Sequence, residues 1–159
     1  MGDTSGMTMK DSTQPVLAHY FTYRLNTLSK LNDMASQAMY TAHTGLTLPE
    51  VRTLAAVGAS DELTVNQLAL EVNLDKGQAS RLAATMARKG FIARRADEHD
   101  KRRVHLKLTR SGRAMWKKVM PLIEQRNDAL LGCLGARERA QLLDIFERLL
   151  AQEKTAQLE

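Results

Sequence analysis

A run of basic residues directly before an alternating strand carries the most evident chemistry in this sequence. Lys101, Arg102 and Arg103 precede residues 104–108, in which apolar and polar residues alternate as they do in a half-buried strand. Residues 90–95 have the composition of a partner strand, and the polar residues in between predict a loop. The sequence therefore predicts a β-hairpin with cations at its tip, and cations on a short turn can enter a groove of DNA.

The positive charge of the chain is concentrated around this hairpin. Residues 75–118 contain 14 Lys or Arg and 4 Asp or Glu, a net charge of +10, whereas the 9 basic and 14 acidic residues elsewhere give −5. Such a concentration is typical of a surface that binds a polyanion. A basic surface that contacts only solvent is the alternative, and charge alone does not decide between the two.

Two short helices are predicted ahead of the hairpin from their N-terminal signals. Thr64 and Gln67 have the spacing of a capping box, and Asp75 and Gln78 repeat that spacing at the start of a second helix that ends near residues 89–90. The short connection between them predicts a helix-turn-helix.

The second of these helices carries small and polar side chains on one face. Ala79, Leu82, Ala83 and Met86 form the side that we expect to be buried. The opposite face is predicted to enter the major groove, which admits an α-helix. The predicted contacts are Lys76, Gln78, Ser80, Arg81, Thr85 and Arg88. An ordinary solvent-exposed face, on which small residues are equally common, is the alternative interpretation.

The hairpin is predicted to supply a second set of DNA contacts. Arg102 is the side chain expected in the minor groove, where the potential is most negative. Asp100 is expected to hold a neighbouring Arg or the backbone of the turn, since a carboxylate is repelled by phosphates; the alternative is that it only forms the turn. The predicted contacts in the hairpin are Arg94, Arg95, Lys101, Arg102 and Arg103.

Long amphipathic helices are predicted at both ends of the chain. The first runs from Pro15 to about Gly45, and a shorter helix opens at residues 48–51. After the hairpin, Thr109 is a suitable N-cap for a helix that Pro121 should bend, and a leucine-rich helix follows. These apolar stripes would face water in a single copy, so we expect a two-fold dimer, with a compact monomer as the alternative.

Several classes of function find no support in the sequence. The four histidines lack the spacing of a zinc site, and there is no glycine-rich phosphate loop and no Gly-x-Ser-x-Gly elbow, so neither an enzyme, a metal site nor a cofactor is expected. No apolar run is long enough for a membrane span, and no export signal is evident. The single Cys133, expected to be a packed and inert thiol, fits a reducing cytoplasm.

At the hairpin the sequence resembles the MarR family of winged-helix transcriptional regulators. The resemblance is carried by Asp100-x-Arg102 followed by Leu108-Thr109, with Gly112 after them and Gly90-x-x-x-Arg94 before. Further matches are Gly45-Leu46-Thr47, Ser80-Arg81-Leu82 and the segment 134–138, so that the resemblance spans roughly residues 16–154. Met86, where the family usually has Leu, and the less usual Pro121 are departures.

The resemblance implies a homodimer that binds a pseudo-palindromic operator through two winged-helix lobes. Ser80 and Arg81 would then contact the major groove and Arg102 the minor groove. The expected fold is mainly α with a small β-hairpin, an α+β class. The expected organisation is a winged helix-turn-helix DNA-binding domain over 47–109, a helical dimerisation region over 15–46 and 110–154, a mobile tail over 1–14 and a tail over 155–159.

Many members of the resembled family release DNA when a small anionic aromatic compound binds between the dimerisation helices and the DNA-binding lobe. An Arg can bind the carboxylate of such a compound while tyrosines stack on its ring. The candidate residues here are His19, Tyr20, Tyr23, Arg24, Tyr40 and Arg52. Packing in the core or in the dimer is the alternative role for the aromatic residues. A repressor is expected, and a constitutive DNA binder or a winged-helix protein-interaction adaptor is the alternative.

Overall fold

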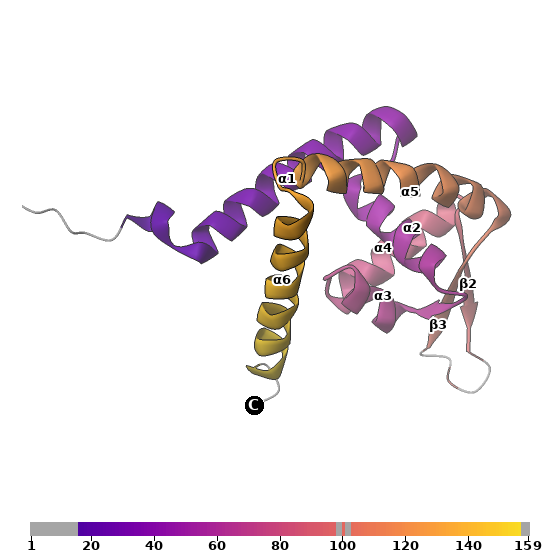
Figure 1. Ribbon diagram of the computed structural model, residues 1–159. Coiled ribbons are helices and arrows are strands. Elements are labelled where there is room, and N and C mark those ends of the chain that lie inside the picture. Colours follow the sequence, from indigo (N-terminus) through magenta and orange to yellow (C-terminus); the bar gives the residue numbers. More distant parts are fainter. Residues whose placement is uncertain (1–15, 98–99, 101–102, 157–159) are drawn as a thin grey trace, which may run out of the picture.

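The computed structural model describes residues 16–97, 100 and 103–156, which form a compact lobe with two projecting helical arms (Figure 1). The first predicted residue of helix 1, Pro15, lies outside the described residues. The elements in chain order are η1 (Leu17–His19), α1 (Phe21–Thr44), α2 (Leu48–Ala59), β1 (Leu63–Thr64), α3 (Val65–Glu71), α4 (Lys76–Arg88), β2 (Ile92–Ala96), β3 (Val104–Leu108), α5 (Arg110–Leu130) and α6 (Ala136–Ala156).

The predicted helix boundaries follow from local capping chemistry. Both expected capping boxes are present: the Thr64 hydroxyl accepts from the Gln67 backbone N–H at 3.3 Å, and the Asp75 carboxylate accepts from that of Gln78 at 2.8 Å. Helix α1 ends at Gly45, whose φ of +70° is in the left-handed region. The chain is extended at Tyr20, so a single 3-10 turn precedes α1 instead of one continuous helix from residue 15.

The predicted β-hairpin is present as part of a three-stranded antiparallel sheet of order β1-β3-β2. Ile92 lies opposite Leu108 in the hairpin, and Leu63 of β1 lies opposite Leu106. Because side chains alternate across a strand, Leu106 and Leu108 are buried while Lys107 is exposed. The third strand was not predicted, since β1 is only two residues long.

The core of the lobe lies between α2, α3, α4, the sheet and α5. Leu54, Leu68, Met86 and Leu106 are fully buried at its centre. On α4 the predicted buried side is confirmed for Ala79, Ala83 and Met86, whereas Leu82 is only half-buried. The fold class is therefore confirmed as mainly α with a small sheet.

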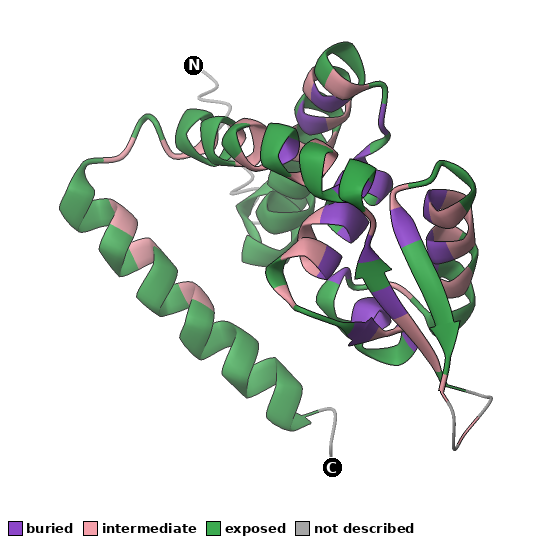
Figure 2. Ribbon diagram, turned by 90° about the vertical axis from the view of Figure 1, so that its right-hand side faces the viewer, coloured by how far each residue is buried: buried purple, intermediate pink, exposed green. Residues whose placement is uncertain are grey.

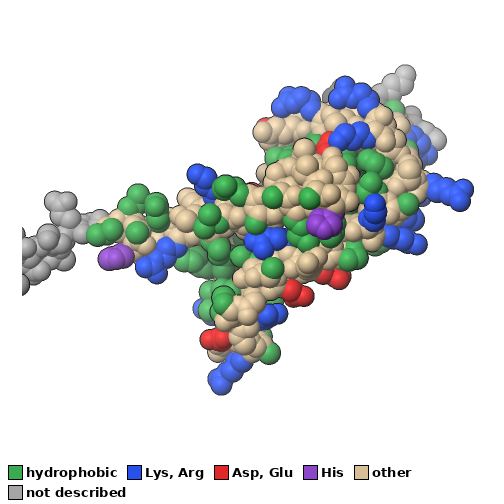
Figure 3. All heavy atoms as spheres, turned by 90° about the horizontal axis from the view of Figure 1, so that it is seen from above, with side chains coloured by type: hydrophobic (Ala, Val, Ile, Leu, Met, Phe, Trp, Pro, Cys, Tyr) green, Lys and Arg blue, Asp and Glu red, His purple; other side chains and the backbone are tan. Residues whose placement is uncertain are grey.

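The arms are largely uncovered. Helix α6 has no buried residue, and Figure 2 shows it mostly exposed along its length. Apolar side chains of α1 lie along the other arm (Figure 3). Helix α5 continues through Pro121, so no break separates its two halves. Cys133, between α5 and α6, is exposed, which contradicts the packed thiol expected from the sequence. None of the described helices combines the length and apolarity of a membrane span.

Candidate nucleic-acid interface

Helix α4 presents its polar face to solvent. Lys76, Gln78, Arg81 and Arg88 are exposed, while Ser80 and Thr85 are half-buried. The amide oxygen of Gln78 accepts from the Asp75 backbone N–H at 3.2 Å, so this predicted contact residue also belongs to the helix cap.

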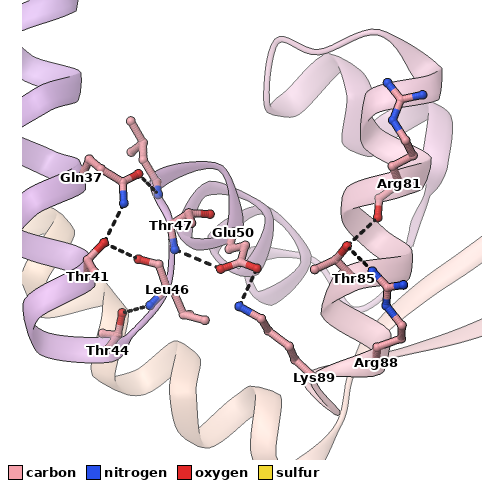
Figure 4. A network of polar contacts seen from close by, with 11 residues as sticks. Gln37, Thr41, Thr44, Leu46, Thr47, Glu50, Arg81, Thr85, Arg88 and Lys89 are labelled. Atoms are coloured by element: carbon pink, nitrogen blue, oxygen red, sulfur yellow. Dashed lines mark hydrogen bonds and ion pairs between the residues drawn. The ribbon is translucent and has the colours of Figure 1, made fainter.

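A short hydrogen-bonded series orders the C-terminal half of that face. The Thr85 hydroxyl donates to the Arg81 carbonyl at 3.1 Å and accepts from Arg88 Nη2 at 3.0 Å, as Figure 4 shows. Arg88 is thereby held along the helix. The guanidinium of Arg81 has no hydrogen bond or ion pair to any described residue, which leaves its donors available to a ligand.

An ion pair between a buried carboxylate and a partly exposed lysine fixes α4 against α2. Lys89 Nζ lies 2.6 Å from Glu50 Oε1, and the Thr47 backbone N–H donates to Glu50 Oε2 at 3.0 Å (Figure 4). Burial alone would raise the pKa of Glu50, but Lys89 and the hydrogen bonds from Thr47 outweigh it and hold that pKa below its ordinary value. Glu50 is not among the site residues predicted from the sequence, although Thr47 and Glu50 have capping-box spacing.

Three of the five predicted arginines and lysines of the hairpin are described, and their surroundings differ. Arg95 Nη2 lies 3.6 Å from Glu62 Oε1, and Arg103 Nε lies 3.8 Å from Asp100 Oδ2. Arg94 is exposed. Lys101 and Arg102, predicted for the tip, lie outside the described residues.

Hydrogen bonds join the two sides of the turn between β2 and β3. The Asp97 N–H donates to the Arg103 carbonyl at 2.9 Å, and the Arg103 N–H donates to the Asp100 carbonyl at 2.8 Å. Asp100 therefore contacts Arg103 in two ways: its carbonyl accepts from the Arg103 N–H, and its carboxylate lies near the Arg103 guanidinium. Holding a neighbouring Arg or the turn was the role expected for Asp100 from the sequence.

Helix α4 and the hairpin border a common hollow of about 340 Å³. Lys76 and Ser80 of α4 line it together with Arg103, and the start of α3 forms the remaining wall, from Thr64 to Gln67. The structure thus brings two of the predicted major-groove residues and one predicted hairpin residue to a single surface. Two cations and several hydroxyl and amide groups on one face suit the phosphates and edges of a nucleic acid.

A larger cleft of about 780 Å³ lies between α1, α2 and α5. Tyr40 and Arg52, predicted from the sequence, line it, together with Arg126 of α5 and Asn73 of the helix-turn-helix connection. Burial raises the pKa of Tyr40 despite a hydrogen bond with Ser36 and the nearby Arg52 and Arg126. Arg52 Nη2 lies 2.6 Å from Asp33 Oδ1, whereas the buried Nε of Arg126 has no hydrogen-bond partner among the described residues.

The remaining four residues predicted for this cleft do not line it within the chain. His19, Tyr20, Tyr23 and Arg24 lie at the outer end of α1 or before it. The helical rise of about 1.5 Å per residue places Tyr23 roughly 25 Å from Tyr40 along the axis. The Arg24 Nε instead donates to the Ala18 carbonyl at 2.9 Å, so these residues are not part of one site with Tyr40 in a single chain.

This chain is similar to known proteins in sequence and in structure. The MarR family model matches residues 44–103, which contain α2 to β2. The HTH-type transcriptional regulator BilQ of Clostridium symbiosum is 30% identical over 105 residues, covering 66% of this chain and 73% of BilQ. The transcriptional repressor MprA of Escherichia coli is 29% identical over 87 residues, covering 55% of this chain and 49% of MprA, about half its length.

The fold is also similar to that of a solved structure. BpsR of Bordetella bronchiseptica, described for the regulation of its DNA binding by 6-hydroxynicotinic acid, has a TM-score of 0.78 at 18% identity. The match covers 86% of this chain and 96% of BpsR. At this identity the likeness concerns the fold.

Proposed function

This chain belongs to the MarR family of transcriptional regulators, and on that premise we propose that it is a homodimeric repressor that binds a pseudo-palindromic operator and releases it when a small aromatic acid binds. The activity of the family is regulation of transcription and not catalysis. Such a regulator acts on DNA in the cytoplasm. The relative MprA is a repressor, which supports the proposed direction of control.

The hollow shared by α4 and the hairpin is the observation that carries the DNA-binding proposal. It places Lys76 and Ser80 beside Arg103, and Arg81 on the same helix has a guanidinium with no partner in the part of the chain that the structure describes. A helix in the major groove and a basic hairpin in the adjacent minor groove would use both sides of this surface. The residues proposed to contact DNA remain those predicted from the sequence, including Arg102 at the tip.

Duplex DNA selected by the protein from random sequences provides the test. Arg81→Ala should weaken binding to the selected duplex by about 1–3 kcal/mol and reduce its salt dependence. Lys154→Ala, which removes the same charge from the end of α6, is the matched control and should bind as the wild type does. Equal affinities of the Arg81 variant and the wild type across a salt series would refute the assigned role. A chain that selects no duplex would instead fit a protein-interaction adaptor.

Exposed apolar residues on both arms support the proposed dimer. Leu31 and Met34 of α1 are 58% and 61% exposed, and Leu143 and Leu150 of α6 are 56% and 55% exposed. A second copy related by a two-fold axis would remove these side chains from water. We therefore assign residues 15–46 and 110–154 to dimerisation and residues 47–109 to DNA binding.

The dimer is tested by measuring the mass of the protein in solution. Leu143→Arg should convert a dimer into a monomer in sedimentation equilibrium, because the charge would have to be buried at the interface. Leu70→Arg on α3, where Leu70 is 79% exposed, is the control and should leave the dimer intact. A wild-type chain that sediments as a monomer at all concentrations would contradict the proposal.

The cleft between α1, α2 and α5 supports the proposed effector site. Arg126 offers a buried donor that has no partner among the described residues, which suits a carboxylate, while Tyr40 and Ile123 give the cleft apolar surface for a ring. BpsR, a protein of the same fold, is regulated by 6-hydroxynicotinic acid, an aromatic acid.

Calorimetry with a panel of hydroxybenzoic and pyridinecarboxylic acids tests the effector. Binding by the wild type that is lost in Arg126→Met and retained in Arg24→Ala, whose side chain lies outside the cleft, would support this site. If no acid gives a heat of binding, the effector proposal fails, and the chain would instead be a constitutive DNA binder.

A further inference from the structure

His105 of β3 lies between two carboxylates on the outer face of the sheet. Its Nε2 is 2.9 Å from Oδ2 of Asp97, which directly follows β2, and its Nδ1 is 3.3 Å from Oε2 of Glu62, just before β1. The side chain is 21% exposed, so the contacts are partly shielded from water. The DNA interface described above makes no use of this histidine.

The same aspartate also holds the turn of the hairpin. Asp97 Oδ1 accepts a hydrogen bond from the Asp100 backbone N–H at 2.9 Å while Oδ2 contacts His105. A continuous series of polar contacts therefore runs from Glu62, through His105 and Asp97, to Asp100. It joins the segment before β1, which belongs to the lobe, to the turn that carries Arg103.

Both ring nitrogens of His105 face an acceptor. A carboxylate accepts but does not donate, and a neutral imidazole has a single N–H, so only the doubly protonated ring can donate to Asp97 and Glu62 together. Arg95 lies opposite His105 in the hairpin and 3.6 Å from Glu62, and Lys107 is two residues along on the same face.

We propose that His105 is a positioning residue that orients the DNA-binding hairpin by bridging Asp97 to Glu62. The bridge holds the turn in the orientation that places Arg103 beside Lys76 and Ser80 of α4. His105 itself contacts no DNA. The proposal rests on the proposed DNA-binding function.

A matched pair of substitutions separates the two ends of the bridge. The amide nitrogen of Gln reaches the position of Nε2, whereas that of Asn reaches the position of Nδ1. H105Q should therefore keep the contact with Asp97 and bind the selected duplex within about twofold of the wild type. H105N should lose that contact and bind about three- to tenfold more weakly.

The salt dependence of DNA binding distinguishes positioning from a direct contact with phosphate. H105N should leave the salt dependence of binding unchanged, whereas K107Q, a loss of charge on the same face, serves as the control for a purely electrostatic effect. Equal affinities of H105Q and H105N would overturn the proposal.

Hydrogen exchange of the Asp100 amide in the wild-type chain tests the bridge without DNA. Protection of this amide should be weaker in H105N than in the wild type and in H105Q. Protection that is the same in all three proteins would refute the bridge. If the wild type selects no duplex while the amide is less protected in H105N than in H105Q, the DNA-binding function fails and the bridge itself is retained.

Discussion

Replacing Lys89 by Met removes the cation that neutralises the carboxylate of Glu50. The Glu50 side chain is only 6% exposed, so its charge would remain in a poorly hydrated position, whereas the Lys89 side chain is 39% exposed. The loss of stability should thus lie between the loss on breaking a surface ion pair, up to about 1 kcal/mol, and the loss on breaking a buried pair, about 3–5 kcal/mol. Because Thr47 still donates to the carboxylate, we expect a loss of about 1–2 kcal/mol in the free energy of unfolding.

The lowered pKa of Glu50 determines how the effect of Lys89→Met on stability changes with pH. The pKa of Glu50 is lowered in the folded protein from its ordinary value of 4.5, so its ionised form stabilises the fold above that pH. This contribution is lost as pH falls through the folded pKa, and most of it depends on Lys89. The stability difference between wild type and Lys89→Met should therefore be full at pH 7 and shrink under acid conditions.

Urea unfolding at several pH values is the assay, combined with a double-mutant cycle. Glu50→Gln keeps an acceptor for the Thr47 N–H and removes the charge, so Lys89→Met should cost much less in that background. Lys107→Met, which replaces an exposed lysine of β3, is the control and should change stability by less than about 0.5 kcal/mol. A coupling energy of zero between positions 50 and 89 would refute the reasoning.

Three further predictions concern other parts of the chain. Gly58→Ala should destabilise the fold by about 1–3 kcal/mol in urea unfolding, because its Cβ would lie 2.1 Å from Cδ1 of Trp116, and the fluorescence of this single tryptophan should change. Asn73 has a φ of +53°, so Asn73→Ala should cost about 1 kcal/mol in thermal unfolding while Asn73→Gly should be nearly neutral. Arg102→Ala should weaken operator binding by about 1–3 kcal/mol and lower its salt dependence in anisotropy titrations, since this residue is expected in the minor groove.

The parts of the fold that sequence reasoning predicted are those encoded by neighbouring residues. The capping pairs that begin at Thr64 and Asp75 act over three residues, and the alternation in residues 104–108 gives the buried face of a strand directly. Strand β1 carries no such signal, because it is two residues long and its Thr64 is also the N-cap of α3.

The candidate site was predicted only in part, because patterns among neighbouring residues do not show how distant helices pack. The face of α4 follows from helical periodicity, but the cleft depends on how α1, α2 and α5 pack. Grouping Tyr23 with Tyr40 ignored the length of the helix between them. Arg126 could have been noticed, because it lies three residues after Ile123 and four before Leu130, and a charged residue on an otherwise apolar helical stripe needs an explanation.

The uninterrupted course of α5 has a mechanical consequence. The helix begins directly after the last strand of the hairpin and runs for 21 residues, about 30 Å, to the level of the arms. A rod of that length converts a rotation of about 5° at one end into a displacement of nearly 3 Å at the other, about the size of one base-pair step. Small angular changes where two copies meet would therefore decide whether both hairpins fit the same stretch of duplex.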